Sequence, residues 1–188
     1  MNLPISGKRI VLRDFEEKDM DHYWRWIQPG NAWQKTDGPY YEPESPEELK
    51  AAFDKLKKRA VEKNFPDPRM FLAMADKESD MLLGRVSSYW ESRETRWLCA
   101  GISIYDQQQW GKGLGYEALG LWGEYLFNAR PDIVRLDLRT WSGNHGMMRL
   151  AEKLGFKLEA RFRKARIVEG EYYDSLGYGI LREEWRGL

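Results

Sequence analysis

Three glycines at alternate positions stand directly before an amphipathic helix pattern, and they constrain the chain more than any other feature. They are Gly111, Gly113 and Gly115 in the run Gln109-Trp-Gly-Lys-Gly-Leu-Gly-Tyr-Glu-Ala118. Glycine lets the backbone take positive φ angles and come close to a ligand. A helix that begins behind it adds unpaired N–H groups and the positive end of its dipole. The segment therefore predicts a pyrophosphate site, with Lys112 adding charge at the rim.

Spacing alone leaves two alternatives to this interpretation. One is a glycine-rich turn without a ligand, which seldom needs three alternate glycines before a helix. The other is dinucleotide binding, because Gly113 to Ala118 fits G-x-G-x-x-G/A and Asp137 follows at about the 20 residues that a ribose-binding acid needs. Against the second, the loop follows more than a hundred residues of other elements, and Asp137 lies in mid-strand between Leu136 and Leu138.

Length and charge narrow the function classes. We expect one domain over residues 1–188, because 188 residues bury one substantial core. Thirty basic residues balance thirty acidic ones, which favours neither a nucleic-acid nor a membrane partner. The first residues lack a leader pattern and no apolar run approaches ~20 residues, so we expect a cytoplasmic protein. One cysteine and two histidines predict neither an internal disulfide nor a metal site.

The order of periodic segments indicates the fold class. Ser45, with Pro46 behind it and Glu48 three residues on, is a capping-box start for one helix. The order is strand, two helices, three strands, helix, strand, helix and two strands, which predicts an α+β domain with one predominantly antiparallel sheet. Strands are expected at 8–14, 69–76, 81–91, 96–105, 133–140 and in a pair turning near 169–170, and helices at 16–28, 45–65, 114–130 and 144–154.

Three collinear segments carry a family resemblance that covers about residues 8–185. Residues 102–119 resemble motif A of the GNAT superfamily of acetyltransferases, in the branch of ribosomal-protein alanine/serine N-acetyltransferases and polyamine acetyltransferases. Residues 144–156 resemble that branch's second motif, and residues 169–185 resemble its closing strand. The resemblance implies a single GNAT-like domain with a central, mostly antiparallel mixed sheet flanked by helices.

The resemblance also implies acetyl-CoA as co-substrate and a place for it. Residues Ile102, Ser103 and Ile104 would offer backbone groups to the pantetheine arm, with one amide polarising the thioester carbonyl. Asn144 would hydrogen-bond the coenzyme from the other side, although the residue alone reads equally well as a helix N-cap. The pyrophosphate would be held by Trp110, Gly111, Lys112, Gly113, Leu114 and Gly115.

The catalytic residues are not identified by the resemblance. The family's frequent thiolate-protonating Tyr corresponds to Ala151, and its frequent Glu near the amine corresponds to Cys99. Trp110 replaces the usual Gln or Arg of motif A. A water chain to Glu91 or Asp106 could remove the amine's proton, but each also reads as a solvated strand-end carboxylate.

Other candidates are weaker. Cys99 alternates with Leu98 and Ala100, which favours a half-buried structural thiol over an acyl-carrying nucleophile. His145 is expected on the surface of a helix's first turn. The aromatic side chains that could line an acceptor cleft, or pack in the core, are Trp24, Trp33, Tyr40, Tyr41, Trp90 and Trp141.

We therefore expect an N-acetyltransferase in which an amine attacks the thioester directly in a ternary complex. The acceptor would be a protein or peptide N-terminus, a polyamine or another small amine. A coenzyme A-binding module without catalysis is the alternative, motivated by Ala151 and Cys99. A homodimer is kept open as a further partner arrangement.

Overall fold

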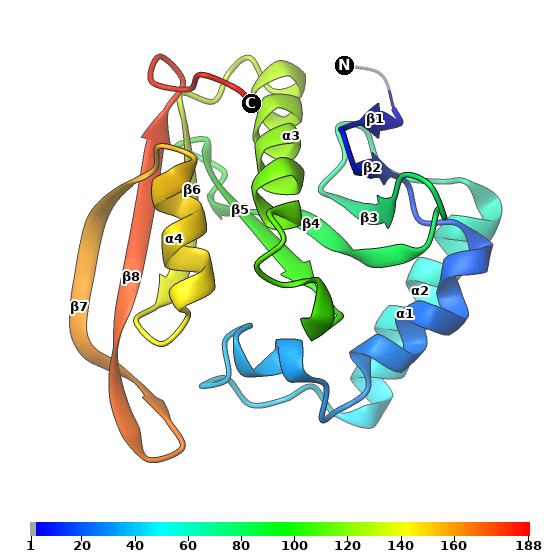
Figure 1. Cartoon of the computed structure of the whole chain (residues 1–188), viewed down its shortest axis with the longest axis horizontal. Helices are drawn as coiled ribbons and strands as arrows, with labels where there is room; N and C mark the ends of the chain where they lie inside the picture. Colours follow the sequence, from blue (N-terminus) through cyan, green and yellow to red (C-terminus); the bar gives the residue numbers. More distant parts are fainter. Residues whose placement is uncertain (1–2) are drawn as a thin grey trace.

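One eight-stranded sheet runs through the computed structural model, which describes residues 3–188 (Figure 1). The strand order is β1-β2-β3-β4-β5-β6-β8-β7, and every neighbouring pair is antiparallel except β5 with β6. The predicted α+β class with a mostly antiparallel sheet is confirmed. The strands are β1 (Ile5–Ser6), β2 (Ile10–Arg13), β3 (Phe71–Asp76), β4 (Leu82–Ser92), β5 (Trp97–Ile104), β6 (Arg135–Trp141), β7 (Lys157–Val168) and β8 (Glu171–Leu181).

Within residues 3–188, four α-helices connect the strands, and short 3-10 turns precede or follow them. The capping box at the start of α2 is formed as predicted, with Ser45 Oγ accepting from the Glu48 N–H at 3.2 Å and the Glu48 carboxylate accepting from the Ser45 N–H at 2.9 Å. The helical elements are η1 (Glu17–Asp19), α1 (Met20–Ile27), η2 (Ala32–Lys35), α2 (Pro46–Glu62), η3 (Gln107–Gln109), α3 (Leu114–Ala129) and α4 (His145–Lys153).

The predicted elements are present, with bounds shifted by a few residues. The strand predicted over residues 133–140 begins later than expected. In that alternation Val134 would share the apolar side with Leu136, but β6 begins only at Arg135 and Val134 is 68% exposed.

Two hydrophobic clusters lie on opposite faces of the sheet. On one face, α3 and α4 cover the sheet through residues such as Trp122 and Ala151, which pack with Leu98 of β5. On the other face, α1 and α2 pack through Tyr23 and Phe53. Figure 1 shows α3 and α4 over the centre and left of the sheet, and α1 and α2 at the right. Side chains of adjacent strand residues therefore enter different clusters.

The sheet opens where its two parallel strands meet. Strands β5 and β6 are paired only from Leu98–Ala100 to Leu136–Leu138. Beyond Ala100, β5 continues beside β4, and beyond Leu138, β6 continues beside β8. The two strands thus part toward their carboxyl ends, and the backbone of residues 101–104 has an unpaired edge.

Candidate active site

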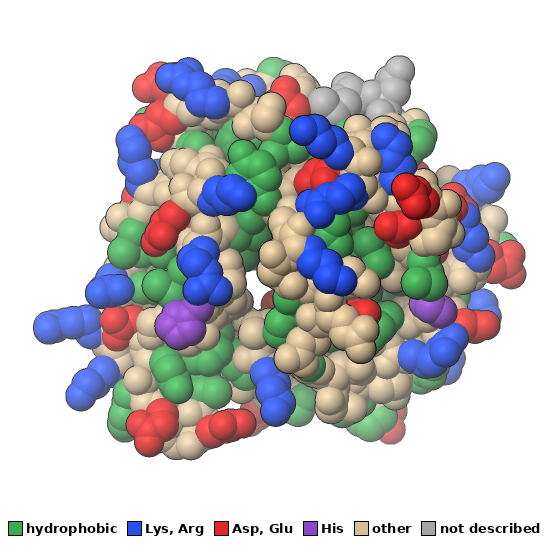
Figure 2. Space-filling view, in the orientation of Figure 1, with side chains coloured by type: hydrophobic (Ala, Val, Ile, Leu, Met, Phe, Trp, Pro, Cys, Tyr) green, Lys and Arg blue, Asp and Glu red, His purple; other side chains and the backbone are tan. Residues whose placement is uncertain are grey.

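A cleft of about 920 Å³ begins where β5 and β6 part. Its walls come from β4, β5, β6, the glycine loop, the first turns of α3 and α4, and the segment 33–41 between α1 and α2. Figure 2 shows a hollow near the centre of this face of the molecule, at the place where the strands separate in Figure 1. The cleft is therefore lined from both faces of the sheet and passes between β5 and β6 where these strands part.

The glycine loop enters this cleft at the start of α3. Gly111 and Gly113 have φ angles of +72° and +81°, the left-handed region that favours glycine. Gly115 lies in the first turn of α3, and all three glycines line the cleft together with Trp110 and Leu114. The sequence-predicted loop residues are thus brought together, and the positive end of the helix dipole faces the cleft.

Lys112 is the loop residue whose side chain is not in the wall of the cleft. Its backbone carbonyl accepts from Arg9 Nη1 at 2.7 Å, and its ammonium donates to Gln109 Oε1 at 3.3 Å. Arg9 is itself held by buried Glu117 of α3, which accepts from the Arg9 N–H at 2.9 Å and pairs with its guanidinium at 3.5 Å. This network ties the beginning of β2 to the loop and fixes the loop's position.

The open edge of β5 presents alternate backbone groups to the cleft. The Tyr105 N–H donates to the Leu83 carbonyl at 3.0 Å, which makes them a hydrogen-bonded pair of the β4–β5 ladder. Because such pairs alternate along antiparallel strands, Ser103 also directs its backbone toward β4, while Ile102 and Ile104 direct theirs to the open side. The Ile104 carbonyl accepts from Trp110 Nε1 at 2.9 Å. The N–H groups of Ile102 and Ile104 and the Ile102 carbonyl therefore face the cleft.

Asn144 lies across the cleft from the glycine loop and caps α4. Its Oδ1 accepts from the Met147 N–H at 2.9 Å, which is the N-cap role that the residue type suggests. Its Nδ2 donates to the Thr36 carbonyl at 3.0 Å. An amide nitrogen carries two hydrogens, so one donor remains, and contact with the coenzyme stays a prediction.

The segment between α1 and α2 closes one end of the cleft. Besides Asn144, Trp141 Nε1 donates to the Thr36 carbonyl at 3.3 Å. The Tyr40 ring lies 6.3 Å from the Trp141 ring, and the Arg166 guanidinium of β7 lies 4.4 Å from the Tyr40 ring centre. Figure 1 shows this segment between α1 and the lower end of α4. Contacts with β6, α4 and β7 thus hold it across the opening.

The expected aromatic wall is present in part. Of the six candidate aromatics, Trp33, Tyr40, Tyr41 and Trp141 line the cleft. The other two, Trp24 and Trp90, pack against the hydrophobic clusters.

The charged side chains of the cleft were not found from the sequence. Asp37 is the only carboxylate among the described residues that line it, whereas the cations are Arg85, Arg139, Arg149 and Lys153. Arg85, Ser87 and Tyr89 alternate along β4 and share one face, and this period-two run of polar residues was the available signal.

The two carboxylates considered as proton acceptors, which also read as solvated strand-end groups, lie outside the cleft wall. Glu91 Oε2 is 3.8 Å from Cys99 Sγ and 3.8 Å from Arg139 Nε. Asp106 caps the 3-10 turn η3 by accepting from the Gln108 N–H at 2.8 Å.

The remaining sequence candidates are placed as follows. Cys99 is fully buried, and burial raises the pKa of its thiol to about 11, which leaves little thiolate at neutral pH and supports a structural role. Ala151 belongs to α4, and its side chain is fully buried in the core. His145 is exposed on the first turn of α4, as expected, and borders the cleft.

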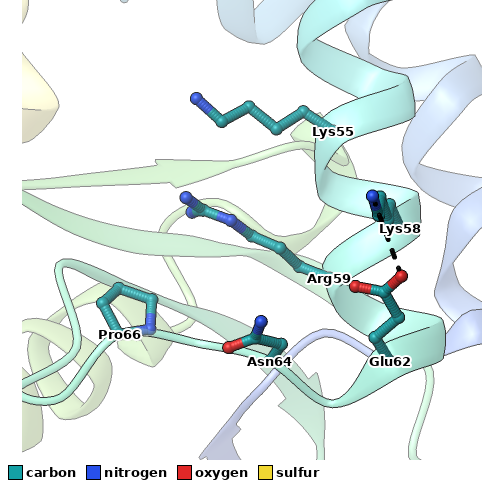
Figure 3. Close-up of a pocket in the computed structure, with 6 residues that line it drawn as sticks. All are labelled: Lys55, Lys58, Arg59, Glu62, Asn64 and Pro66. Atoms are coloured by element: carbon teal, nitrogen blue, oxygen red, sulfur yellow. Dashed lines mark ion pairs between the residues drawn. The ribbon is translucent and has the colours of Figure 1, made fainter.

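A second pocket lies on the surface of α2, away from the cleft. It has a volume of about 360 Å³ and is lined by Lys55, Lys58, Arg59, Glu62, Asn64 and Pro66. Figure 3 shows Lys55 and Arg59 extending from the helix in the same direction, while Lys58 pairs with Glu62 at 3.9 Å. None of these residues belongs to the cleft, and we assign no chemistry to this pocket.

Residues 3–188 contain no group of three or more His, Cys, Asp and Glu side chains that is arranged to hold a metal ion. No helix in that range combines the length and apolar character that crossing a membrane requires.

Comparison with known proteins identifies the relatives of this architecture. The chain is 27% identical over 188 residues to the uncharacterized N-acetyltransferase YnaD of Bacillus subtilis (strain 168), covering 96% of this chain and 98% of that protein. A GNAT-family acetyltransferase from Bacillus anthracis has the same fold with a TM-score of 0.74 at 20% identity, over 97% of this chain and 100% of that one. The ribosomal-protein-S5-alanine acetyltransferase of Vibrio fischeri aligns with a TM-score of 0.70 at 16% identity, over 98% and 100% of the two chains.

These findings decide between the family interpretations of the glycine loop. Asp137 is buried within β6 and accepts from Arg135 Nε at 2.7 Å, so it does not serve as the exposed ribose-binding acid of the dinucleotide alternative. Residues 9–157 match the model of the acetyltransferase (GNAT) domain. The chain is therefore an acetyltransferase of the GNAT domain family.

Proposed function

We propose that the protein transfers the acetyl group of acetyl-CoA to the amine of a small molecule, with the coenzyme in the opening between β5 and β6. The open edge of β5 supports this, because the pantetheine amides can pair with the backbone groups of Ile102 as a neighbouring strand would. The N–H groups that begin α3 suit a pyrophosphate. Arg149 and Lys153 of α4 add positive charge for the phosphate on the ribose of the coenzyme.

The proposed reaction is direct attack of the neutral amine on the thioester carbonyl. The carbon–nitrogen bond forms, the carbon–sulfur bond breaks, the amine proton passes to water and the thiolate is protonated from water. A backbone N–H on the open edge of β5, from Ile102 or Ile104, would stabilise the negative oxygen that develops. The protein would act mainly by orienting the two substrates and excluding water. This assignment fits the burial of Ala151 and Cys99, which correspond to the family's acid and base positions and do not line the cleft.

A small acceptor is favoured by the closed end of the cleft, and this single observation carries that part of the proposal. The Thr36 carbonyl accepts from both Trp141 and Asn144, and Tyr40 contacts Trp141 and Arg166. The segment from Thr36 to Tyr41 therefore covers the side of the sheet from which an acceptor would approach. A folded protein's N-terminus would have to displace these contacts, whereas a small amine would not.

The test has two stages. Thermal-shift measurements with acetyl-CoA, CoA and NADPH should show stabilisation by the first two only. Thiol release should then be measured against small amines and against peptides of matched N-terminal sequence. Turnover of small amines with little on peptides is the expected result. Coenzyme binding without turnover on any amine would support the non-catalytic module, and preferred turnover of peptides would contradict the small acceptor.

A further inference from the structure

Arg85 is a cation of the cleft that has no hydrogen-bond or ion-pair partner among residues 3–188. Arg85 is half-buried in β4, lies opposite Ser103 of β5 and lines the cleft. Its Nε is buried and has no hydrogen-bond partner within residues 3–188. Asp37 and Glu44 act on the guanidinium through space, without a hydrogen bond. A guanidinium in this position is costly unless its donors are satisfied.

A second unpartnered polar atom lies beside it. The Tyr105 hydroxyl is buried and has no hydrogen-bond partner in the described part of the chain. Burial raises the pKa of this phenol. Tyr105 lies two residues beyond Ser103, the residue that is paired with Arg85, so Tyr105 and Arg85 are diagonal neighbours on one face of the sheet. Buried polar atoms in proteins are usually paired. Arg85 lines the cleft, whereas Tyr105 lies behind that wall, packed against Trp26 and Trp33. The unpaired donor of Arg85 therefore indicates a binding position for an acceptor of hydrogen bonds.

A carboxylate, that of Asp37, lies on the same side of the sheet as Arg85. Asp37 accepts from Ser103 Oγ at 3.2 Å, and Ser103 is the residue paired with Arg85 across the β4–β5 ladder. Asp37 and Arg85 form no ion pair with each other among the described contacts. One wall thus presents a separate carboxylate and a separate guanidinium.

The other cations of the cleft are accounted for. Arg139 lies 3.8 Å from both Glu91 and Asp137 and 5.1 Å from the ring centre of Trp97. Arg149 and Lys153 belong to α4, on the face of the sheet where we place the coenzyme phosphates. Arg85 is therefore the cation left for the acceptor.

On the basis of the proposed acetyl transfer, we propose that the acceptor is a small amino acid-like zwitterion. Its carboxylate binds the Arg85 guanidinium, and its ammonium lies at Asp37 before it loses a proton and attacks. A guanidinium suits this role because its planar fork matches a carboxylate. A polyamine, which carries only positive charge, would be repelled by Arg85.

Binding to the CoA-saturated protein tests this without requiring turnover. Calorimetry should compare α-amino acids with their primary amides at a pH below the pKa of both amines, so that only the carboxylate differs. We expect the best amino acids to bind about 10- to 100-fold more tightly than their amides, as for a charge-assisted hydrogen-bonded pair. Arg85→Gln should abolish this ratio, and Arg85→Lys should keep part of it. Arg59→Gln, in the α2 pocket, is the matched control and should keep all of it.

The results separate this proposal from the proposed function. Equal binding of amino acids and amides by the unaltered protein would overturn the zwitterion, as would an unchanged ratio in a folded Arg85→Gln variant. If that variant does not fold, the ratio of amino acid to amide affinity in the unaltered protein and in Arg85→Lys still tests the proposal. Failure of acetyl-CoA to bind, or of any amine to release thiol, would instead count against acetyl transfer. Affinity for acetyl-CoA should be the same in all variants.

Discussion

Replacing Gly113 by alanine should weaken coenzyme binding far more than the same change at Gly170. Both glycines have left-handed backbones, with φ angles of +81° and +85°. A methyl group at position 113 would meet only the end of the flexible Arg9 side chain, at 3.2 Å, and one at position 170 would meet no described atom within 4 Å. The two positions are thus matched in strain, but only Gly113 lines the cleft.

The magnitudes of the two effects differ. Alanine in a left-handed conformation costs about 1–2 kcal/mol of folding free energy, and we expect this loss in both variants. At position 113 the methyl group also keeps a phosphate from the backbone N–H groups that begin α3. Losing one hydrogen bond to a charged group costs about 1.5–3 kcal/mol, which corresponds to roughly a 10- to 100-fold rise in Kd.

Isothermal titration with acetyl-CoA measures the Kd, and thermal unfolding of each free variant measures the shared strain. We expect similar Tm values for Gly113→Ala and Gly170→Ala, with the Kd raised only in the first. If a folded Gly113→Ala variant bound acetyl-CoA as tightly as Gly170→Ala, the glycine loop would not be the pyrophosphate site.

Three further predictions follow from burial and charge. Ala151→Tyr should destabilise the fold by about 1–3 kcal/mol in denaturant unfolding, because Ala151 is fully buried and a phenol would overpack the core; a raised kcat with unchanged stability would contradict this placement. Cys99 should resist alkylation in the native protein, as mass spectrometry can show. Because burial raises the pKa of its thiol to about 11, the stability that Cys99 contributes should be complete below about pH 9 and fall toward pH 11. The kcat/KM for an alkylamine should rise through neutral pH toward the amine's own pKa, and a plateau beginning near pH 6 that Asp37→Asn removes would show that Asp37 is the base.

The local parts of the fold were predictable because their signals are contiguous. Alternation predicted the central strands, and the pair Ser45 and Glu48 predicted the start of α2. The two-residue strand β1 was missed because so short a segment has no periodicity. The parting of β5 and β6 could not be read from the sequence either, since it depends on which strand each edge pairs with beyond Ala100.

The site divides in the same way. Its proposed coenzyme half lies in two continuous motifs, so the glycine loop and Asn144 were identified and the structure places them around one cleft. Its proposed acceptor half is assembled from separate segments. Arg85 is an ordinary polar residue of an alternating strand, and Asp37 lies in a loop whose position depends on the Thr36 carbonyl contacts. The alternation of Arg85 with Ser87 and Tyr89 is visible in the sequence, but the approach of Asp37 to that face is established only when the chain is folded.

The short parallel pairing between β5 and β6, here called the seam, also determines which parts of the sheet can unfold separately in solution. Strands β1–β5 and β6–β8 meet through the pairs Leu98–Leu136, Cys99–Asp137 and Ala100–Leu138. Free-energy differences between parts of a protein appear in amide hydrogen exchange as separate cooperative units. We expect the two halves to exchange as two such units in the free protein. A ligand seated across the seam should merge them, with a gain of about 2.7 kcal/mol in protection at a concentration of one hundred times Kd.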